Sequence, residues 1–390
     1  MEWSGGTARA VHHPTTCMNT NNNNGVRVSE KSTGLAKAAA VLSEIFLGID
    51  TSAAKHVITR LIPGEGPKPA EAMSTETLVA KVAKWVNAGV AVHCVYEAGP
   101  TGFALHRRLV KTGATCLVVR PKRLERHQRR RKNDAQDSRI LAEELAARHF
   151  TGSGNLVPVR IPTEQEELNR LAVRERETIN RARHQILNSA KGRALALGYP
   201  LPRQWWRPRV WPKLKDQFPP ELVRLLERTM QTAAAMKLQL TAAEAELKAT
   251  APEAPVGVGQ ITAAVLEREV CSWERFPSDK KLSSFFGLCP CEDSSADRHH
   301  LGAIDKHGSP RLRFWCQEAA WRLFKHQPDY HVIIWARRKM AGANSSRMKQ
   351  IAVAVARRFL VDWWKVRTGQ TTFAALGLRC VESTSRSAMS

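Results

Sequence analysis

The chain has 390 residues, with 60 Lys and Arg against 36 Asp and Glu, which gives a formal net charge of +24 and a pI near 10.2. Such an excess of positive charge favours polyanionic partners and argues against a passive metabolic role. Because 43% of the residues are hydrophobic, the chain can bury a sizeable core, which excludes full disorder. Its length predicts roughly two to three domains.

The eight cysteines follow no regular spacing, and several lie inside apolar runs. Thiols in that setting behave as small hydrophobic groups, so we expect a reducing compartment. The first 40 residues lack the continuous apolar stretch of a signal peptide, and no later segment approaches ~18 apolar residues. We therefore expect a cytosolic, soluble protein with no membrane partner.

The amino-terminal third changes character at Glu44. Residues 1–43 contain Asn21 to Asn24 and little periodic hydrophobicity, which predicts a disordered tail. The next segments are short, rich in β-branched residues and closed by Gly, Pro or polar residues, and we expect strands in EIFLGIDTS, KHVITRLIP, VAVHCVYEAG and ATCLVVRP. Thr75–Asn87 and Gly102–Thr112 have a helical period. This alternation predicts an α/β domain with a mixed sheet over residues 44–160.

A helical region is expected over residues 161–250. Apolar residues recur at helical spacing in two long stretches, one from Leu168 to Leu187 and one from Leu222 to Leu247. A Pro- and Trp-rich segment from Pro200 to Pro212 separates them. The pattern predicts an antiparallel coiled-coil arm or packing against a partner's copy, with a helical bundle without oligomeric role about equally supported.

We expect a mainly α-helical domain over residues 251–370 and a flexible tail over residues 371–390. The domain opens with PVGVGQITAAVL, whose glycines resemble a hairpin between helices with amide groups that could hold a phosphate; a plain capping turn explains them almost as well. Phe285 to Pro310 has the composition of a loop. From Arg311 onward, tryptophans punctuate basic helical segments, and most should lie in the core.

Four acidic residues stand out in this basic chain. Asp50 ends the run IFLGID and Glu97 ends the run HCVYE, so both carboxylates should project from neighbouring strand ends at one edge of the sheet. Asp134 and Asp137 would share one face of a helix starting at Asp134. Converging carboxylates suit Mg²⁺ or Mn²⁺, and two such ions can serve a phosphodiester exchange.

The alternative for Asp134 and Asp137 is helix capping, and for Asp50 and Glu97 it is a turn role. Weighed singly, capping is favoured. The segment directly before Asp134 favours the metal site, because it has eight Lys or Arg in thirteen positions. Although such a run is usually a solvated loop, here it predicts contacts with nucleic-acid phosphates by Arg120, Lys122, Arg123, Arg126, Arg129, Arg130, Arg131 and Lys132.

A second candidate centre lies between Gly287 and Arg313. It contains Ser294 and Ser295, with basic residues around them, and a serine among cations can attack a phosphodiester. Its candidate nucleic-acid contacts are Arg298, Lys306 and Arg311. A zinc site is a weaker alternative, because only Pro290 separates its two cysteines; the ligands would be Cys289, Cys291, His299 and His300.

The ordered motifs of the chain resemble one family. They cover roughly residues 44–367 and are LGIDTS, YEAGPTG followed by LVKTG, VVRPKRL, KNDAQDSRILAE, GVGQITAAVLEREV, FPSDKKLSSFFGLCP, SS and LGAIDKHGSPRLR. In this order they are similar to the blocks of the DEDD transposases of bacterial insertion sequences, which are relatives of the pilin-gene DNA invertases. The order of the blocks is more specific than any one motif.

The resemblance implies a RuvC/RNase H-like amino-terminal domain in which Asp50, Glu97, Asp134 and Asp137 hold Mg²⁺. It implies a serine nucleophile at Ser295, with Ser294 as the fallback. Ala296 stands where the family usually has glycine, and His299 and His300 stand where Arg is common. The implied mechanism is a covalent phosphoserine link to one strand, which a freed hydroxyl then reseals.

The resemblance also implies partners that composition does not indicate. These are donor and target DNA, a structured noncoding guide RNA, and other copies of the chain in dimers that join into tetramers. The implied location is the bacterial cytoplasm, in association with the nucleoid during the reaction.

Three functions compete at this stage. The first is an RNA-guided DNA recombinase that moves its own element. The second is a metal-dependent RuvC-like nuclease or junction resolvase without a covalent intermediate. The third is a non-enzymatic basic nucleic-acid-binding protein whose carboxylates are helix caps.

Overall fold

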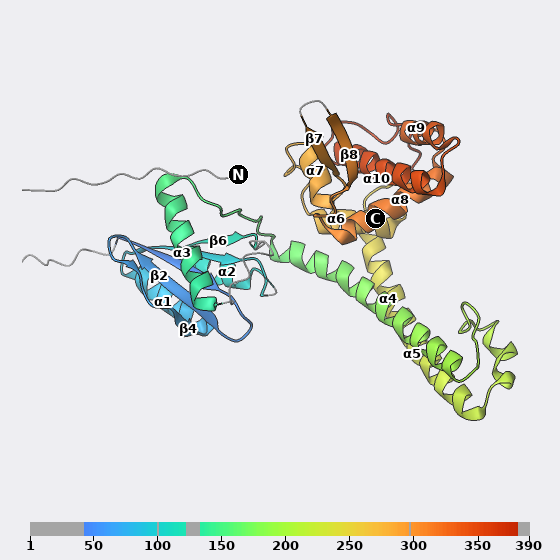
Figure 1. Ribbon diagram of the computed structural model, residues 1–390. Helices are drawn as coiled ribbons and strands as arrows, with labels where there is room; N and C mark the ends of the chain where they lie inside the picture. The colour runs from blue at the N-terminus through green and yellow to red at the C-terminus, as the bar shows by residue number, and fades with distance from the viewer. Residues whose placement is uncertain (1–42, 100, 122–132, 296–297, 381–390) are drawn as a thin grey trace, which may run out of the picture. The chain divides into compact units, whose positions relative to one another are not determined.

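The computed structural model describes residues 43–99, 101–121, 133–295 and 298–380, with the backbone alone between 292 and 301 (Figure 1). The chain divides after Arg160 into two compact units, Met1–Arg160 and Ile161–Ser390. No helix in the described ranges combines the length and the apolar character that crossing a bilayer requires. The tail segments 1–42 and 381–390 lie outside the described residues.

The first unit contains a mixed sheet, as the sequence predicted. Strand order is β3-β2-β1-β5-β6, and β4 also pairs with β2. The central strand β1 runs antiparallel to β2 and parallel to β5, which is itself parallel to β6. The strands are β1 (Glu44–Asp50), β2 (His56–Ile62), β3 (Gly66–Pro67), β4 (Glu71–Met73), β5 (Ala91–Glu97) and β6 (Thr115–Val119).

Helices cover this sheet because β1 is apolar on both of its faces. Five consecutive residues of β1, Ile45 to Ile49, include no exposed side chain, and a strand of that kind needs cover on both sides. α3 (Asp134–Thr151) packs against β1, β2 and β5, while α1 (Thr75–Asn87) contacts β5 and α2 (Ala104–Lys111) contacts β6. The predicted helix Thr75–Asn87 has the same bounds in the structure.

Gly48 lets α3 approach the sheet closely. A Cβ atom at this position would lie 1.9 Å from the carbonyl oxygen of Ser138 and 2.4 Å from the amide nitrogen of Ala142. Beside this contact, the buried hydroxyls of Thr59 on β2 and Ser138 on α3 are 2.9 Å apart and share a hydrogen bond. The first two turns of α3 are therefore fixed over β1 and β2.

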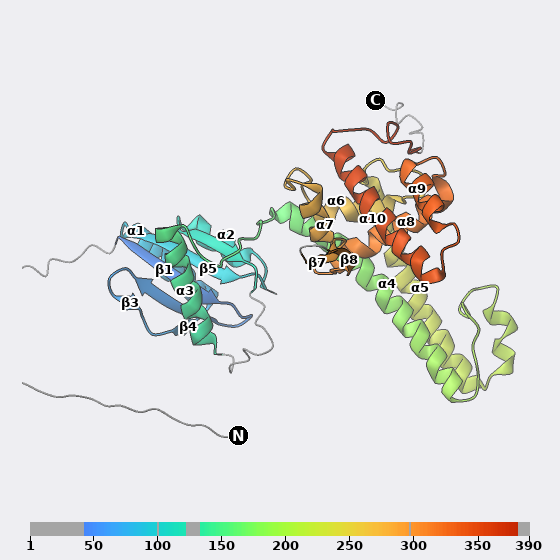
Figure 2. The ribbon, with the colours of Figure 1, turned by 45° about the horizontal axis from the view of Figure 1, so that its top comes forward.

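The second unit begins with two long helices, α4 (Glu164–Ala196) and α5 (Pro220–Ala249), which lie side by side (Figure 2). They run antiparallel, because Arg176 pairs with Glu244 near one end while Leu187 and Leu222 share a core near the other. Buried residues on α5 recur at steps of seven, at Leu226, Ala233, Leu240 and Leu247. The heptad spacing agrees with a coiled coil, whose supercoil stays a prediction.

The connection between α4 and α5 forms its own aromatic cluster. Trp205 is fully buried there, and Trp211 stacks on Phe218 with ring centroids 6.1 Å apart. Two short 3-10 helices, η2 (Trp211–Lys213) and η3 (Lys215–Gln217), complete the segment. The Pro- and Trp-rich composition of this connection therefore reflects a small core at the end of the helix pair.

Five further helices and one hairpin build the carboxy-terminal part. Their shared core includes Phe359 and Trp363, both fully buried, whereas Trp321 remains 48% exposed, so the expectation for the tryptophans holds only in part. At the expected hairpin before the first of these helices, Gly257 has a φ of +96°, which favours glycine. The helices are α6 (Gln260–Val270), α7 (Asp279–Phe286), α8 (Pro310–His326), α9 (His331–Met340) and α10 (Ser345–Arg367).

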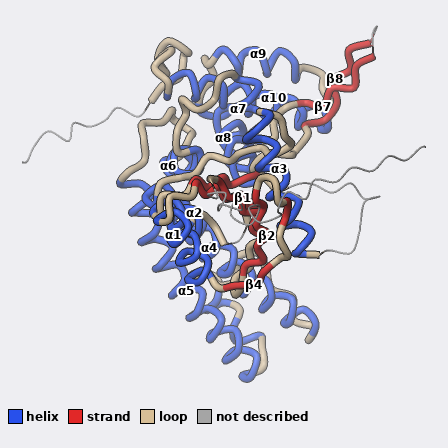
Figure 3. Tube along the Cα trace, turned by 90° about the vertical axis from the view of Figure 1, so that its left-hand side faces the viewer, coloured by secondary structure: helices blue, strands red, loops and turns tan. Residues whose placement is uncertain are grey.

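The structure corrects two expectations in this region. The stretch Phe285–Pro310 is not a loop throughout, because it contains the antiparallel strands β7 (Pro290–Ser295) and β8 (Arg298–Ile304), which extend out from the helices (Figure 3). Backbone hydrogen bonds rather than apolar alternation define this hairpin, so the pattern gave no strand signal. The flexible tail does not begin at residue 371, because Phe373 and Leu378 are buried in the core.

Candidate active site

Asp50 and Glu97 end adjacent parallel strands. The register pairs Gly48 with Val95 and Ile49 with Tyr96, so the next residues along the two strands are Asp50 and Glu97. Side chains alternate along a strand, and Gly48, two residues before Asp50, faces α3. Val95, two residues before Glu97, belongs to the same buried apolar cluster as Leu141 of α3. Both carboxylates therefore project from the carboxyl end of the sheet on the face that α3 covers.

Asp134 and Asp137 lie in the first turn of α3. The residue that caps this helix is Asn133, whose side chain accepts a hydrogen bond from the backbone N–H of Ala135 at 3.1 Å. Asp134 therefore does not fill the capping position that the alternative assigned to it. Ser138 of α3 lies against Gly48, and His149 at the far end of the helix lies against Phe46, nearer the start of β1. The first turn of α3 therefore lies at the carboxyl end of β1, toward Asp50 and Glu97.

The four carboxylates do not form a tight cluster. Among the residues that the structure describes, the group of three whose ligand atoms lie within 4.8 Å of one another consists of Glu44, His93 and His149. A divalent ion at the carboxylates would therefore use a subset of them. That arrangement fits Mg²⁺, which is usually held by one or two carboxylates together with substrate phosphates and water.

A groove of about 650 Å³ lies beside the start of α3. Its walls come from β2, the segment around Pro67 and the first turns of the helix, with Asn133 and Gln136 among the lining residues. It also carries Lys68 and Arg139, which pair with Glu65 at 2.7 Å and with Glu143 at 2.8 Å. The groove thus offers hydrogen-bonding groups and two cations beside the first turns of α3, the helix that begins with Asp134 and Asp137.

Most of the predicted basic run lies outside the described residues. Arg120 is exposed directly after β6, and its backbone N–H donates to Val157 at 2.9 Å. The remaining residues of the run lie outside the described part of the chain, and they are Lys122, Arg123, Arg126, Arg129, Arg130, Arg131 and Lys132.

Ser294 and Ser295 belong to the second unit, at the end of β7. In the hairpin register Ser295 pairs with Arg298 and Ser294 with His299, so both serines lie next to the turn. Their side chains, like those of Arg298, His299 and His300, are not among the described atoms, and Ala296 lies outside the described residues. The zinc alternative therefore keeps only two described ligands, and Cys289 already donates its thiol hydrogen to the carbonyl of Lys280 at 3.5 Å.

The base of this hairpin is fixed by a close backbone contact. A Cβ atom at Gly308 would lie 2.2 Å from the amide nitrogen of Gly287, so a side chain there would collide with the end of α7. The N–H of Asp305 donates to Cys289 and that of Ser309 to Phe285, each at 2.8 to 2.9 Å. Between them, Lys306 is exposed and has a φ of +56°. The KHGSP motif thus has a structural role at the hairpin's base.

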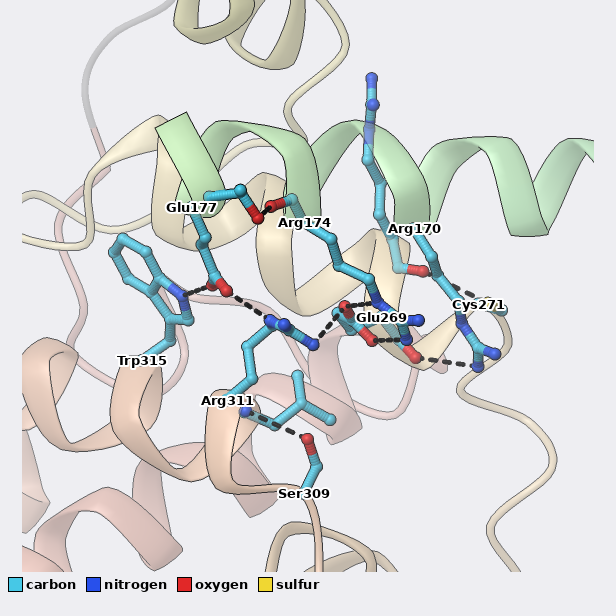
Figure 4. A network of polar contacts seen from close by, with 11 residues as sticks. Arg170, Arg174, Glu177, Glu269, Cys271, Ser309, Arg311 and Trp315 are labelled. Atoms are coloured by element: carbon cyan, nitrogen blue, oxygen red, sulfur yellow. Dashed lines mark hydrogen bonds and ion pairs between the residues drawn. The ribbon is translucent and has the colours of Figure 1, made fainter. Parts of the chain in front are cut away.

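Arg311, a predicted nucleic-acid contact, lies in an ion-pair network (Figure 4). Its guanidinium donates to Glu177 on α4 at 2.6 Å and to Glu269 on α6 at 3.2 Å. Glu269, only 6% exposed, also accepts both hydrogen bonds of a bidentate pair with Arg174, which raises the pKa of Arg174. Trp315 donates its indole N–H to Glu177. The network joins α4 to α6 and α8, and a role of Arg311 in binding nucleic acid stays a prediction.

Sequence reasoning missed several of these residues. Glu177 and Glu269 were two among many acids on charged helices, and nothing in their spacing marks a partner more than 40 residues away. Glu44, His93 and His149 come from two strands and a helix. A histidine inside the apolar run VHCVYE was the available signal for His93, because a polar residue on a buried strand usually has a specific contact.

Comparisons with known proteins relate this chain to transposases. Residues 254–332 match the model of the Transposase IS116/IS110/IS902 family. Over 366 residues the chain is 28% identical to "Putative transposase y4rJ" of Sinorhizobium fredii, an alignment that covers 83% of this chain and 92% of the relative. The "Transposase for insertion sequence element IS1111A" of Coxiella burnetii is 25% identical over 313 residues, which are 75% of this chain and 83% of that protein.

The family match lies in the second unit, where it includes the serine-bearing hairpin, and the pairwise similarities extend over both units. The matched family and the names of these relatives together relate this chain to the transposases of the IS116/IS110/IS902 family.

Proposed function

We propose that this protein is a transposase that cuts and rejoins DNA at the ends of an insertion sequence. The observation that carries the proposal is the strand register: Asp50 and Glu97 end adjacent strands and face the helix that begins with Asp134 and Asp137. A sheet edge with two carboxylates opposite two more is a suitable place to hold a scissile phosphate through divalent ions. The family match and the net charge of +24 support DNA as the substrate.

Asp50, Glu97, Asp134 and Asp137 would supply the ligands of one or two divalent ions, each ion held by a subset of the four carboxylates together with substrate phosphates and water. They offer only carboxylate oxygens, which suit Mg²⁺ or Mn²⁺ and not a softer metal. The ion would neutralise charge that develops on the phosphate oxygens during strand cleavage. The fold fixes the positions of the four carboxylate side chains, because two strands and one closely packed helix supply them.

Ser295 is the proposed nucleophile in the second unit. Its Oγ forms a bond to phosphorus, the bond from phosphorus to one DNA oxygen breaks, and that oxygen leaves as a hydroxyl with the serine proton. A strand hydroxyl later attacks the phosphoserine, and Ser295 recovers its proton. Arg298 and Lys306 would stabilise the negative charge at phosphorus. The pairing of Ser295 with Arg298 in the hairpin supports this assignment.

The reaction would also involve a guide RNA and further copies of the chain. A noncoding RNA would select donor and target DNA by base pairing, and the protein would act as a dimer that joins into a tetramer. The helix pair α4–α5 offers exposed Leu195, Leu225 and Leu238 for contacts with other copies. Purifying the full chain and sequencing the RNA bound to it tests the guide, because a discrete species encoded beside the gene is expected.

Strand exchange between donor and target DNA tests the chemistry. Asp50→Ala and Ser295→Ala should each abolish exchange, because one removes a metal ligand and the other the nucleophile, while binding to DNA stays within about twofold of wild type. Ser294→Ala is the matched control and should keep exchange. If Ser295→Ala recombines at the wild-type rate, the nucleophile is assigned wrongly.

A denaturing gel separates the two enzymatic hypotheses. The recombinase should leave protein covalently attached to labelled DNA in wild type and Ser294→Ala but not in Ser295→Ala. Magnesium-dependent cleavage without any covalent product would favour the nuclease or junction resolvase. Binding to DNA without cleavage in the presence of either Mg²⁺ or Mn²⁺ would favour the non-enzymatic function.

A further inference from the structure

Two histidines and a glutamate meet at the edge of the first unit's sheet that lies opposite the carboxylates. Glu44 begins β1, His93 lies near the start of β5, and His149 lies in the last turn of α3. One ligand atom from each lies within 4.8 Å of the other two. Asp50 lies six residues after Glu44 along β1, a distance of about 20 Å of strand. The group is therefore separate from the proposed magnesium site.

The geometry of His93 is that of a metal ligand with an oriented ring. Its Nδ1 lies 2.7 Å from the hydroxyl oxygen of Thr115 on β6, so an N–H there can donate to Thr115. The other ring nitrogen, Nε2, is buried and has no hydrogen-bond partner in the described part of the chain. A histidine that ligates a metal characteristically donates its other nitrogen to such a partner, which fixes the tautomer and leaves a lone pair for the ion.

An aromatic ring covers one side of the group formed by Glu44, His93 and His149. Phe46 stacks on the ring of His93 at 5.0 Å and meets that of His149 edge-on at 5.2 Å. The two imidazole centroids are 4.7 Å apart, and His149 Nε2 is 3.5 Å from a carboxylate oxygen of Glu44. An ion pair between Glu44 and a protonated His149 would use two of these residues, but it would leave Nε2 of His93 without a partner.

We propose that Glu44, His93 and His149 bind a zinc ion. Two imidazoles and one carboxylate are a ligand set that proteins use for Zn²⁺, with a water in the fourth position. Nitrogen ligands of this kind do not suit Mg²⁺, so the two sites would select different metals. The ion would join the starts of β1 and β5 to the last turn of α3, at the end of the helix opposite to Asp134 and Asp137.

Zinc titration of the full chain, freed of metal by a chelator and kept in excess Mg²⁺, tests the site. Isothermal calorimetry should show one more bound Zn²⁺ in wild type than in His149→Gln, or an affinity at that site about 100-fold weaker in the variant. His149 is exposed at a helix end, so the substitution should fold; Glu44→Gln, which keeps shape, should give the same loss. Circular dichroism checks folding of both.

Two further measurements make the result specific. Co²⁺ bound in place of Zn²⁺ should give the visible absorption of a low-symmetry, four-coordinate site in wild type and lose it in both variants. Thr115→Val removes the partner of His93 without removing a ligand and should weaken Zn²⁺ binding by about 10- to 100-fold. A structural role for Thr115 alone would not change the metal affinity.

The controls test three other histidines of the chain. His184→Gln, an exposed residue of α4, should bind Zn²⁺ as wild type does. His12 and His13 precede the described residues and could also take zinc, so the double variant His12→Gln/His13→Gln should likewise be unchanged. Zinc binding that persists in both His149→Gln and Glu44→Gln, or that disappears with His12 and His13, would overturn the site, whatever the outcome for strand exchange.

Discussion

Single residues set how closely α3 approaches the sheet, and Gly48 is the most sensitive of them. Because an added Cβ would collide with two backbone atoms of α3, Gly48→Ala should displace the helix and lower the free energy of unfolding by about 3 kcal/mol or more. Denaturant unfolding of the full chain measures the change. Gly192→Ala is the control, since its added Cβ meets nothing within 4 Å and should stabilise α4 by up to ~1 kcal/mol.

An unchanged unfolding midpoint in Gly48→Ala would mean that α3 packs elsewhere.

The sequence indicated that Gly48 lies in a strand, but not why a glycine is needed there. LGID was readable as a strand that ends in a carboxylate, whereas the need for glycine depends on a helix that begins 86 residues after Gly48. The same limit applies to His93, whose partners come from β1, β6 and α3.

Helices of the second unit are joined by charge as well as by apolar packing. Removing the charge of Glu269 by Glu269→Gln should cost about 2–3 kcal/mol, because Arg174 and Arg311 would lose a nearly buried partner. Thermal unfolding of the full chain provides the measurement. The exposed pair of Glu221 and Arg224 is the control, and Glu221→Gln should stay within about 0.5 kcal/mol of wild type. Equal effects in the two variants would show that the network adds nothing.

Elements with a strong periodic pattern were predictable, and those held together by tertiary contacts were not. The four principal strands and helices α1, α3, α4 and α5 follow apolar runs or helical spacing, with boundaries set by Pro, Gly and capping residues. The hairpin β7–β8 was missed because Glu292, Asp293, Ser294 and Ser295 include no apolar residue. Phe373 and Leu378 were missed because two isolated apolar residues in a tail have no period.

For the candidate site, the placement of Asp50 and Glu97 at strand ends could be read from sequence, because β1 and β5 are apolar runs that each end in an acid. That the two strands would be neighbours was also expected, and β1 does pair with β5. The exact register, which puts Asp50 next to Glu97, depends on how the apolar faces pack together and could not be read from any local pattern.

The whole molecule carries a charge of +24, and its binding to DNA should depend steeply on salt. If the run from Arg120 to Lys132 contacts phosphates, replacing Arg129, Arg130 and Arg131 together by Ala should reduce the slope of log affinity against log salt by roughly 3. Fluorescence anisotropy with duplex DNA from about 50 to 200 mM salt measures the slope.

The control for this experiment removes the same charge elsewhere. Arg322, Lys325 and Lys339 are exposed on α8 and α9, and their joint replacement by Ala lowers the net charge equally. A local phosphate-binding segment requires that the first triple variant change the slope far more than the second. Equal changes would mean that DNA senses the overall positive field, because long-range attraction depends on total charge and not on which side chains supply it.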